Sequence, residues 1–110
     1  MNYKEVLEEA KEALELKEDF RIRVKKMKIK AASISFKSRT IRINRELAGD
    51  TELLRYLVYH ELAHYKLRSG GHGRDFYELL YSKLGRDFVK KEERRVIEKM
   101  LRLNDFRKLF

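Results

Sequence analysis

The amino-acid sequence predicts a single α+β domain with an N-terminal helix, a small three-stranded antiparallel sheet and three further helices. Two periodicities support this prediction: apolar residues recur at helical spacing over residues 3–17 and again after residue 50, and they alternate in the stretch between. A chain of 110 residues is long enough for one hydrophobic core and too short for two comfortable domains. We therefore expect residues 1–110 to form one domain.

The first predicted element is an amphipathic helix over residues 3–17. Glutamate and lysine residues occupy one face of this helix, so that face should be in contact with water. The opposite face is apolar and should pack on the core; it consists of Tyr3, Val6, Leu7, Ala10, Ala13 and Leu14.

Residues 20–44 change to a period of two, which predicts three short antiparallel strands. The alternation is clear at Ile22 and Val24, is interrupted before Met27, and returns at Ile41 and Ile43. The interruption indicates a bulge or the end of one strand. Residues 37–39, with the sequence Lys-Ser-Arg, are the expected turn of a hairpin.

Three helices are predicted in the second half of the chain. The first runs from residue 51 to residue 67, with Asp50 or Thr51 as the N-cap, and the Ser-Gly-Gly sequence at 69–71 ends it. The next spans about 73–84 and is closed by Gly85, and the last covers about 90–103.

The composition predicts a soluble cytoplasmic protein. No apolar run approaches the roughly 18 residues that cross a bilayer, and the N-terminus lacks the apolar core of a signal peptide. Charged residues make up 41% of the chain, a pattern typical of heat-adapted proteins. The net charge of +9 permits a nucleic-acid partner but does not by itself favour one.

All three histidines lie within "HELAHYKLRSGGH", residues 60–72. His60 and His64 are four residues apart on the predicted helix, so both imidazoles can reach one ion from the same side. Because the chain contains no cysteine, a zinc site must use histidine, carboxylate or backbone oxygen. Glu61 is placed beside the ion, as in the H-E-x-x-H pattern, where it can take a proton from zinc-bound water. The alternative is a pair of core histidines without metal.

His72 is the expected third zinc ligand, since a catalytic zinc keeps a fourth position open for water. We expect Gly70, Gly71 and Gly73 to adopt positive φ and to turn the chain so that His72 is presented from the first turn of the next helix. Asp75, one turn further on, is either an acceptor for a ligand histidine or a surface carboxylate near a helix N-terminus.

Two residues that flank His72, Arg74 and Tyr77, are candidate donors to the oxyanion of a tetrahedral intermediate. The alternative for Tyr77 is ordinary packing at helical spacing.

Residues 39–80 resemble the minigluzincin family of minimal zinc metallopeptidases. They also share "HELxH", the later His72 and Phe76 four positions beyond it with SprT-like and DUF45 hydrolases. The resemblance implies a zincin-like fold with zinc bound by His60, His64 and His72, with Glu61 as the general base. It also implies a twisted antiparallel sheet above the active-site helix, with an edge strand along the cleft. We expect that edge strand to contain Ile41, Arg42 and Ile43 and to pair with an extended peptide substrate.

The resemblance further implies latency through a C-terminal segment. Residues 104–110 are the candidate cleft-blocking tail, and their alternative role is to pack on the core. The predicted function is thus a zinc metalloendopeptidase acting on peptides or proteins, as a monomer or dimer. Two alternatives remain open: a zinc-dependent nuclease or other nucleic-acid-associated hydrolase, and a non-enzymatic module with structural zinc.

Overall fold

The computed structural model describes the backbone of residues 2–108 and the side chains of residues 2–103. The side chains of the predicted tail, residues 104–110, therefore lie outside the described part of the chain. The cleft-blocking role of this tail stays a prediction. The elements are α1 (Tyr3–Ala13), β1 (Arg21–Lys25), β2 (Ala32–Ser35), β3 (Thr40–Asn44), α2 (Arg45–Ala48), α3 (Thr51–Leu67), α4 (Arg74–Leu84) and α5 (Arg86–Lys108).

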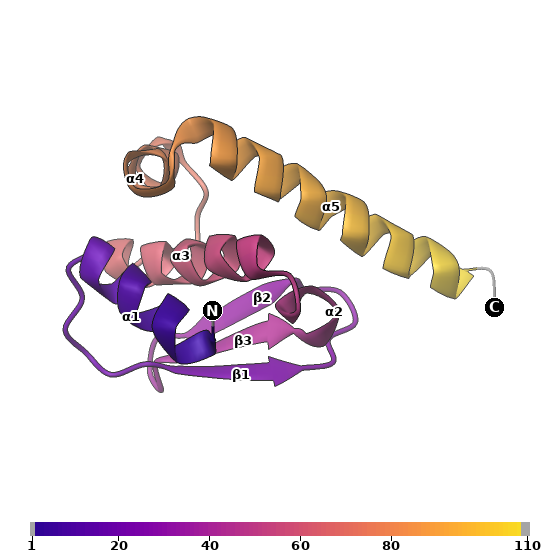
Figure 1. The fold of residues 1–110 in the computed structure, drawn as a ribbon, viewed down its shortest axis with the longest axis horizontal. Coiled ribbons are helices and arrows are strands. Elements are labelled where there is room, and N and C mark those ends of the chain that lie inside the picture. The colour runs from indigo at the N-terminus through magenta and orange to yellow at the C-terminus, as the bar shows by residue number, and fades with distance from the viewer. Residues whose placement is uncertain (1, 109–110) are drawn as a thin grey trace.

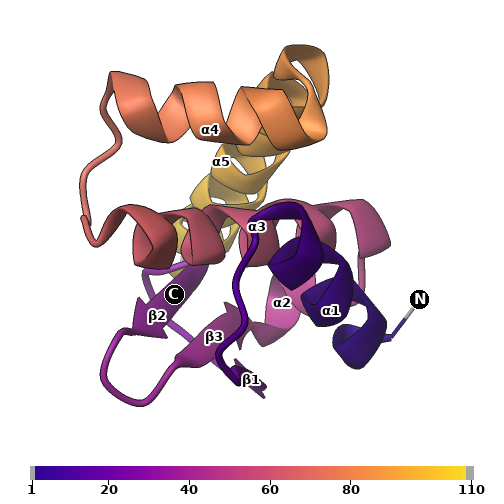
Figure 2. The ribbon, with the colours of Figure 1, turned by 90° about the vertical axis from the view of Figure 1, so that its left-hand side faces the viewer.

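The elements form three layers, with α3 in the middle (Figure 1). The sheet lies on one side of α3, and α4 and α5 lie on the other, while α1 runs beside α3 over the same face of the sheet (Figure 2). Eleven of the 17 residues of α3 are buried, so this helix is covered on more than one side. The α+β architecture is as predicted.

Helix α3 begins and ends where the sequence indicates. The Asp50 side chain accepts hydrogen bonds from the backbone N–H groups of Glu52 and Leu53, so it satisfies two otherwise unpaired donors of the first turn. At the other end, Arg68 adopts a left-handed conformation with φ 53°. The predicted positive φ at Gly70, Gly71 and Gly73 is wrong, because Arg68 itself makes the turn.

The sheet is mixed, which corrects the antiparallel prediction. The strand order is β1-β3-β2, in which β2 pairs antiparallel with β3 and β1 pairs parallel with β3. The hairpin across residues 37–39 is therefore confirmed, but β1 ends at Lys25 and lies on the far side of β3. As a result β3, with Ile41, Arg42 and Ile43, is the central strand and cannot be the predicted edge strand.

Asn44, at the end of β3, holds the connection that lets β1 cross to the far side. Its side-chain NH₂ group donates to the carbonyl oxygens of Met27 and Lys30, both at 3.0 Å. Its side-chain oxygen accepts from the N–H of Glu46 and so caps α2. A fully buried amide that is satisfied on both sides fixes residues 26–31 against the end of the central strand.

Three helix boundaries differ from the sequence prediction. Helix α1 ends at Ala13 because Glu15 takes a positive φ of 57°, although Leu14 remains fully buried. Helix α5 begins at Arg86, directly after Gly85 with φ 87°, and continues past residue 103. The short helix α2 was not predicted. Among residues 2–108, no helix is long and apolar enough to cross a membrane.

Candidate metal centre

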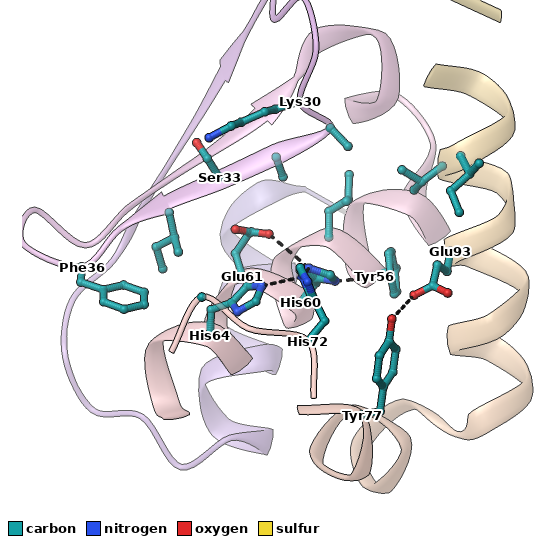
Figure 3. A pocket seen from close by; sticks show the side chains of 17 residues that line it. Lys30, Ser33, Phe36, Tyr56, His60, Glu61, His64, His72, Tyr77 and Glu93 are labelled. Atoms are coloured by element: carbon teal, nitrogen blue, oxygen red, sulfur yellow. Dashed lines mark hydrogen bonds and ion pairs between the residues drawn. The ribbon is translucent and has the colours of Figure 1, made fainter. Parts of the chain in front are cut away.

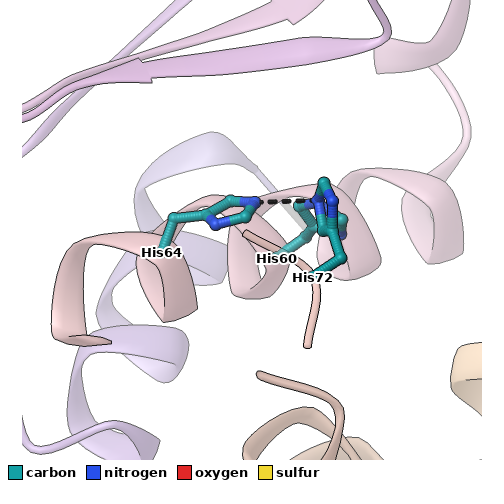
Figure 4. Close-up of side chains that lie close together, drawn as sticks. All are labelled: His60, His64 and His72. Carbon is teal, nitrogen blue, oxygen red and sulfur yellow. Dashed lines mark hydrogen bonds between the residues drawn. The ribbon is translucent and has the colours of Figure 1, made fainter. Parts of the chain in front are cut away.

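Three imidazole rings converge at one point beside α3 (Figure 4). The Nε2 atom of His72 lies 3.1 Å from the Nε2 atoms of both His60 and His64. His60 and His64 project from adjacent turns of α3, and His72 comes from the connection between α3 and α4, just before the helix on which it was expected. The structure therefore brings the three histidines together as the sequence predicts.

Hydrogen bonds at the other ring nitrogens orient two of these imidazoles. The Nδ1 atom of His64 lies 2.8 Å from the carbonyl oxygen of Ser69, and that of His60 lies 3.1 Å from the hydroxyl of Tyr56. A carbonyl oxygen only accepts, so the proton of His64 is on Nδ1 and its Nε2 carries a lone pair. Tyr56 can accept the Nδ1 proton of His60 in the same way, which fixes the tautomer suited to metal binding.

Burial keeps the ring of His60 neutral. Burial, together with the neighbouring imidazoles of His64 and His72, lowers the pKa of His60 to about 3. Burial also lowers the pKa of His64, although its hydrogen bond to the Ser69 carbonyl opposes this shift. Both rings are therefore uncharged at neutral pH, which is the form that binds metal.

The donor set fits a divalent metal ion of the zinc type. Nitrogen ligands about 2.0–2.1 Å from a tetrahedral ion are about 3.3 Å from each other, close to the observed separations of 3.1 Å. Lone pairs that point at one another repel unless a cation lies between them. Three protein ligands also leave a fourth tetrahedral position open, as in catalytic zinc sites.

Phe76 packs against all three imidazoles. Its ring is stacked on His64 with centroids 4.5 Å apart, and contacts His60 and His72 edge-to-face at 4.8 and 5.0 Å. Phe76 is 2% exposed and lies one turn into α4, so this single side chain joins α4 to the histidines of α3. It restricts the rotamers of the rings.

Glu61 is a buried carboxylate beside the histidines. Its Oε2 atom lies 3.8 Å from Nε2 of His60, and the residue is 6% exposed. Burial raises the pKa of Glu61 to about 7, although the positive charge of Lys30 opposes this shift. A carboxylate with such a pKa can exchange a proton near neutral pH.

A cleft of about 710 Å³ opens beside the three histidines and Glu61 (Figure 3). One wall is the free edge of β2, including Ala32, Ser33 and Ile34, with Lys30 before this strand and Phe36 after it. The opposite wall comes from α5. The edge strand along the cleft is therefore β2.

A family model for the YgjP-like metallopeptidase domain matches residues 1–96. The chain belongs to this YgjP-like metallopeptidase family. The match includes the three histidines, Glu61 and Phe76, and it ends within α5.

Two solved metallopeptidase zymogens share the fold of this YgjP-like domain. Jannalysin of Methanocaldococcus jannaschii superposes with a TM-score of 0.79 at 34% identity, over 91% of this chain and 98% of that one. Abylysin of Pyrococcus abyssi superposes with a TM-score of 0.81 at 27% identity, over 89% and 94%. These matches confirm the predicted minigluzincin resemblance.

The YgjP-like domain also has a relative among curated sequences. The protein MJ0123 of Methanocaldococcus jannaschii is 35% identical over 100 residues, which cover 89% of this chain and 91% of that protein. The similarity therefore extends over nearly the full length of both chains.

The remaining predicted site residues of this YgjP-like domain have separate outcomes. Asp75 is exposed in the first turn of α4, and the partners of the Nδ1 atoms of His60 and His64 are instead the Tyr56 hydroxyl and the Ser69 carbonyl. Arg74 is exposed and pairs with Glu78 at 2.8 Å. Both side chains are exposed, and neither lines the cleft.

Tyr77 does line the cleft, but its hydroxyl is engaged. It donates to Oε2 of Glu93 at 2.7 Å, and this bond, together with burial, raises the pKa of Tyr77 to about 12. The single hydroxyl proton is thus directed at Glu93 and away from an oxyanion. Neither Tyr56 nor Glu93 was predicted from the sequence; the i, i+4 spacing of Tyr56 and His60 was the available signal for the first.

Proposed function

We propose that this protein is a zinc metalloendopeptidase in which His60, His64 and His72 bind the ion and Glu61 is the general base. The observation that carries the proposal is the convergence of three histidine Nε2 atoms beside a buried carboxylate. The Nε2 atom of His72 lies 3.1 Å from those of His60 and His64, and the carboxylate is that of Glu61. The match to a metallopeptidase family model supports peptide bonds as the substrate class.

Glu61 has the position and proton affinity that amide hydrolysis requires. When bound, zinc polarises the scissile carbonyl and lowers the pKa of a water molecule. Glu61 Oε2, 3.8 Å from the Nε2 of His60, takes the proton of that water and gives it to the leaving amine nitrogen. Tyr56 and the Ser69 carbonyl hold the histidine rings in place through these steps.

The edge of β2 offers a binding surface for an extended peptide. Because β2 pairs with β3 on one side only, its other backbone N–H and C=O groups face the cleft. A substrate strand can pair with these groups by strand addition, which gives affinity with little side-chain selectivity.

Zinc analysis with a His72 variant tests the metal site. The purified chain should contain one zinc, and His72→Ala should weaken zinc binding by more than about a hundredfold, because a ligand is lost and not merely its support. His72 is exposed, so the variant should fold normally. Plasma mass spectrometry and competition with a chelator measure both quantities.

Asp75→Ala is the matched control for this test, because Asp75 is an exposed residue three positions after His72 and does not line the cleft. Native zinc affinity in His72→Ala, equal to that of Asp75→Ala, would refute the three-histidine site.

Latency through residues 104–110 is the second part of the proposal. The two zymogens of similar fold support it, and the family match ends at residue 96, so the tail lies beyond the conserved domain model. Deleting residues 104–110 should raise the hydrolysis of a fluorogenic peptide while circular dichroism stays unchanged. Equal activity of the full and shortened chains would show that the tail does not block the cleft.

The alternatives have less support. A nucleic-acid-associated hydrolase depends on the net charge of +9, whereas the family match is to metallopeptidases. A purely structural zinc would leave the buried Glu61 beside the ion without a role. We also propose that the protein is cytoplasmic and comes from a heat-adapted organism, both on the composition alone.

A further inference from the structure

Glu93 of α5 places a second carboxylate on the wall of the cleft, apart from Glu61 (Figure 3). The side chain is half-buried, and its Oε2 atom accepts the hydroxyl of Tyr77 from α4 at 2.7 Å. This hydrogen bond fixes the direction of the carboxylate. The proposed hydrolysis uses Glu61 and the histidines, so it leaves Glu93 without a part in the chemistry.

The charge of Glu93 is not balanced by a cation of the described chain. None of the ion pairs found among residues 2–103 includes Glu93, although the chain carries 27 lysine and arginine residues. Tyr77, its hydrogen-bond donor, is neutral. Lys30, the cation that lines the same cleft, acts on Glu61. A half-buried carboxylate without a cation in so basic a protein is unusual and suits a positively charged ligand.

The surroundings of Glu93 fit a cation at the end of an apolar stem. Val96 and Ile97 follow it on α5 and line the same cleft, as do Tyr56 and Leu57 of α3. Aliphatic and aromatic walls cover methylene groups, and they lower the local dielectric constant so that a charge pair is stronger than in water.

We propose that Glu93 is a specificity residue that binds an ammonium or guanidinium group of the peptide substrate. The inference rests on the proposed peptidase function. Two parts of a peptide carry such a cation: a lysine or arginine side chain, and the N-terminal amine. A side chain would make the enzyme select basic residues near the cleaved bond, whereas the amine would make it select short N-terminal segments.

A purely structural role for Glu93, as a link between α4 and α5, is separable by experiment. Glu93→Gln removes the charge but keeps an oxygen that accepts the Tyr77 proton. Loss of selectivity in this variant, with unchanged thermal stability, can only come from the charge.

The test measures the binding of short peptides to zinc-loaded Glu61→Gln protein by calorimetry, at full length and with residues 104–110 deleted, because the proposed tail would block the cleft of the full-length chain. The peptides carry lysine or its uncharged analogue norleucine at each position in turn, and each is made with a free and an acetylated N-terminus. We expect about tenfold tighter binding when the cation is present, from one charged hydrogen bond. If acetylation of the N-terminus abolishes the tighter binding, the bound cation is the N-terminal amine. If replacement of lysine by norleucine abolishes it, the bound cation is the side chain.

In the Glu93→Gln background the preference should disappear. Glu98→Gln is the matched control, because Glu98 is exposed on the same helix and does not line the cleft, and it should keep the preference. For the chain without residues 104–110, equal binding of all peptides, no binding of any, or a preference that survives Glu93→Gln would overturn the assignment. Hydrolysis by the same shortened chain with native Glu61 is a separate readout: its absence would count against the peptidase and would leave the binding result to decide on Glu93.

Discussion

Replacing Glu61 with glutamine is expected to leave one zinc per chain and to reduce peptide hydrolysis by about 10²–10⁴-fold. Glutamine has nearly the same shape, so the packing beside His60 is kept. It cannot take up a proton, whereas burial raises the pKa of Glu61 to about 7 and makes it an effective acceptor near neutral pH. The measurement is kcat/KM on a fluorogenic peptide, in a chain length at which the native residue gives activity, together with zinc content.

Glu52→Gln is the matched control for this substitution. Glu52 lies in the first turn of the same helix, at the end distant from the metal centre, and pairs with Lys91 and Arg95 at the surface. Its loss should change neither zinc content nor hydrolysis. If Glu61→Gln retained both zinc and full hydrolysis, Glu61 would have no part in proton transfer and the proposed mechanism would fail.

Replacing Phe76 with alanine is expected to weaken zinc binding by about 10–100-fold and to lower the free energy of unfolding by about 3–5 kcal/mol. Two effects add. The variant leaves a cavity at a residue that is 2% exposed, and it frees three imidazoles whose ring centroids lie 4.5–5.0 Å from the phenyl ring. Chemical denaturation of the metal-free chain measures the free energy of unfolding. Competition with a chelator measures the zinc affinity separately.

Phe88→Ala separates the loss of packing from the loss of support for the histidines. Phe88 is partly buried against the core from α5 and does not line the active-site cleft. It should lose less stability than Phe76→Ala and keep its zinc affinity. Phe76→Leu, which fills part of the space, should lie between native and alanine; unchanged zinc affinity in a folded Phe76→Ala chain would show that the phenyl ring does not position the ligands.

Local chemistry accounts for the parts of the fold that were predicted well. Asp50 satisfies N–H groups of the first turn of α3, and this requirement is visible in the sequence because a cap acts within three residues. The hairpin between β2 and β3 is equally local. The parallel pairing of β1 was missed, since it depends on the buried side chain of Asn44 holding the connection at Met27 and Lys30, residues 17 and 14 positions away.

The same distinction holds at the site. His60, Glu61 and His64 lie on adjacent turns of one helix whose geometry is fixed, so their relation could be worked out from spacing alone. The edge strand was placed on β3 instead of β2, because alternation shows that residues form a strand but not which neighbours that strand has. Asp75 was one candidate partner of the histidines, because it follows His72 by three residues, whereas Tyr56, which does lie beside His60, was not considered.

The sequence alone thus determined which residues can hold a metal ion, on which helix they lie, and that a carboxylate stands beside them, because these relations arise within a few residues of regular backbone. Only the tertiary structure decided which strand edge lines the cleft, which groups orient the imidazoles, and that Glu93 of α5 faces the cleft with Tyr77 as its partner. These features depend on packing between α3, α4, α5 and β2, and packing between distant segments is set by the whole core and not by any local pattern.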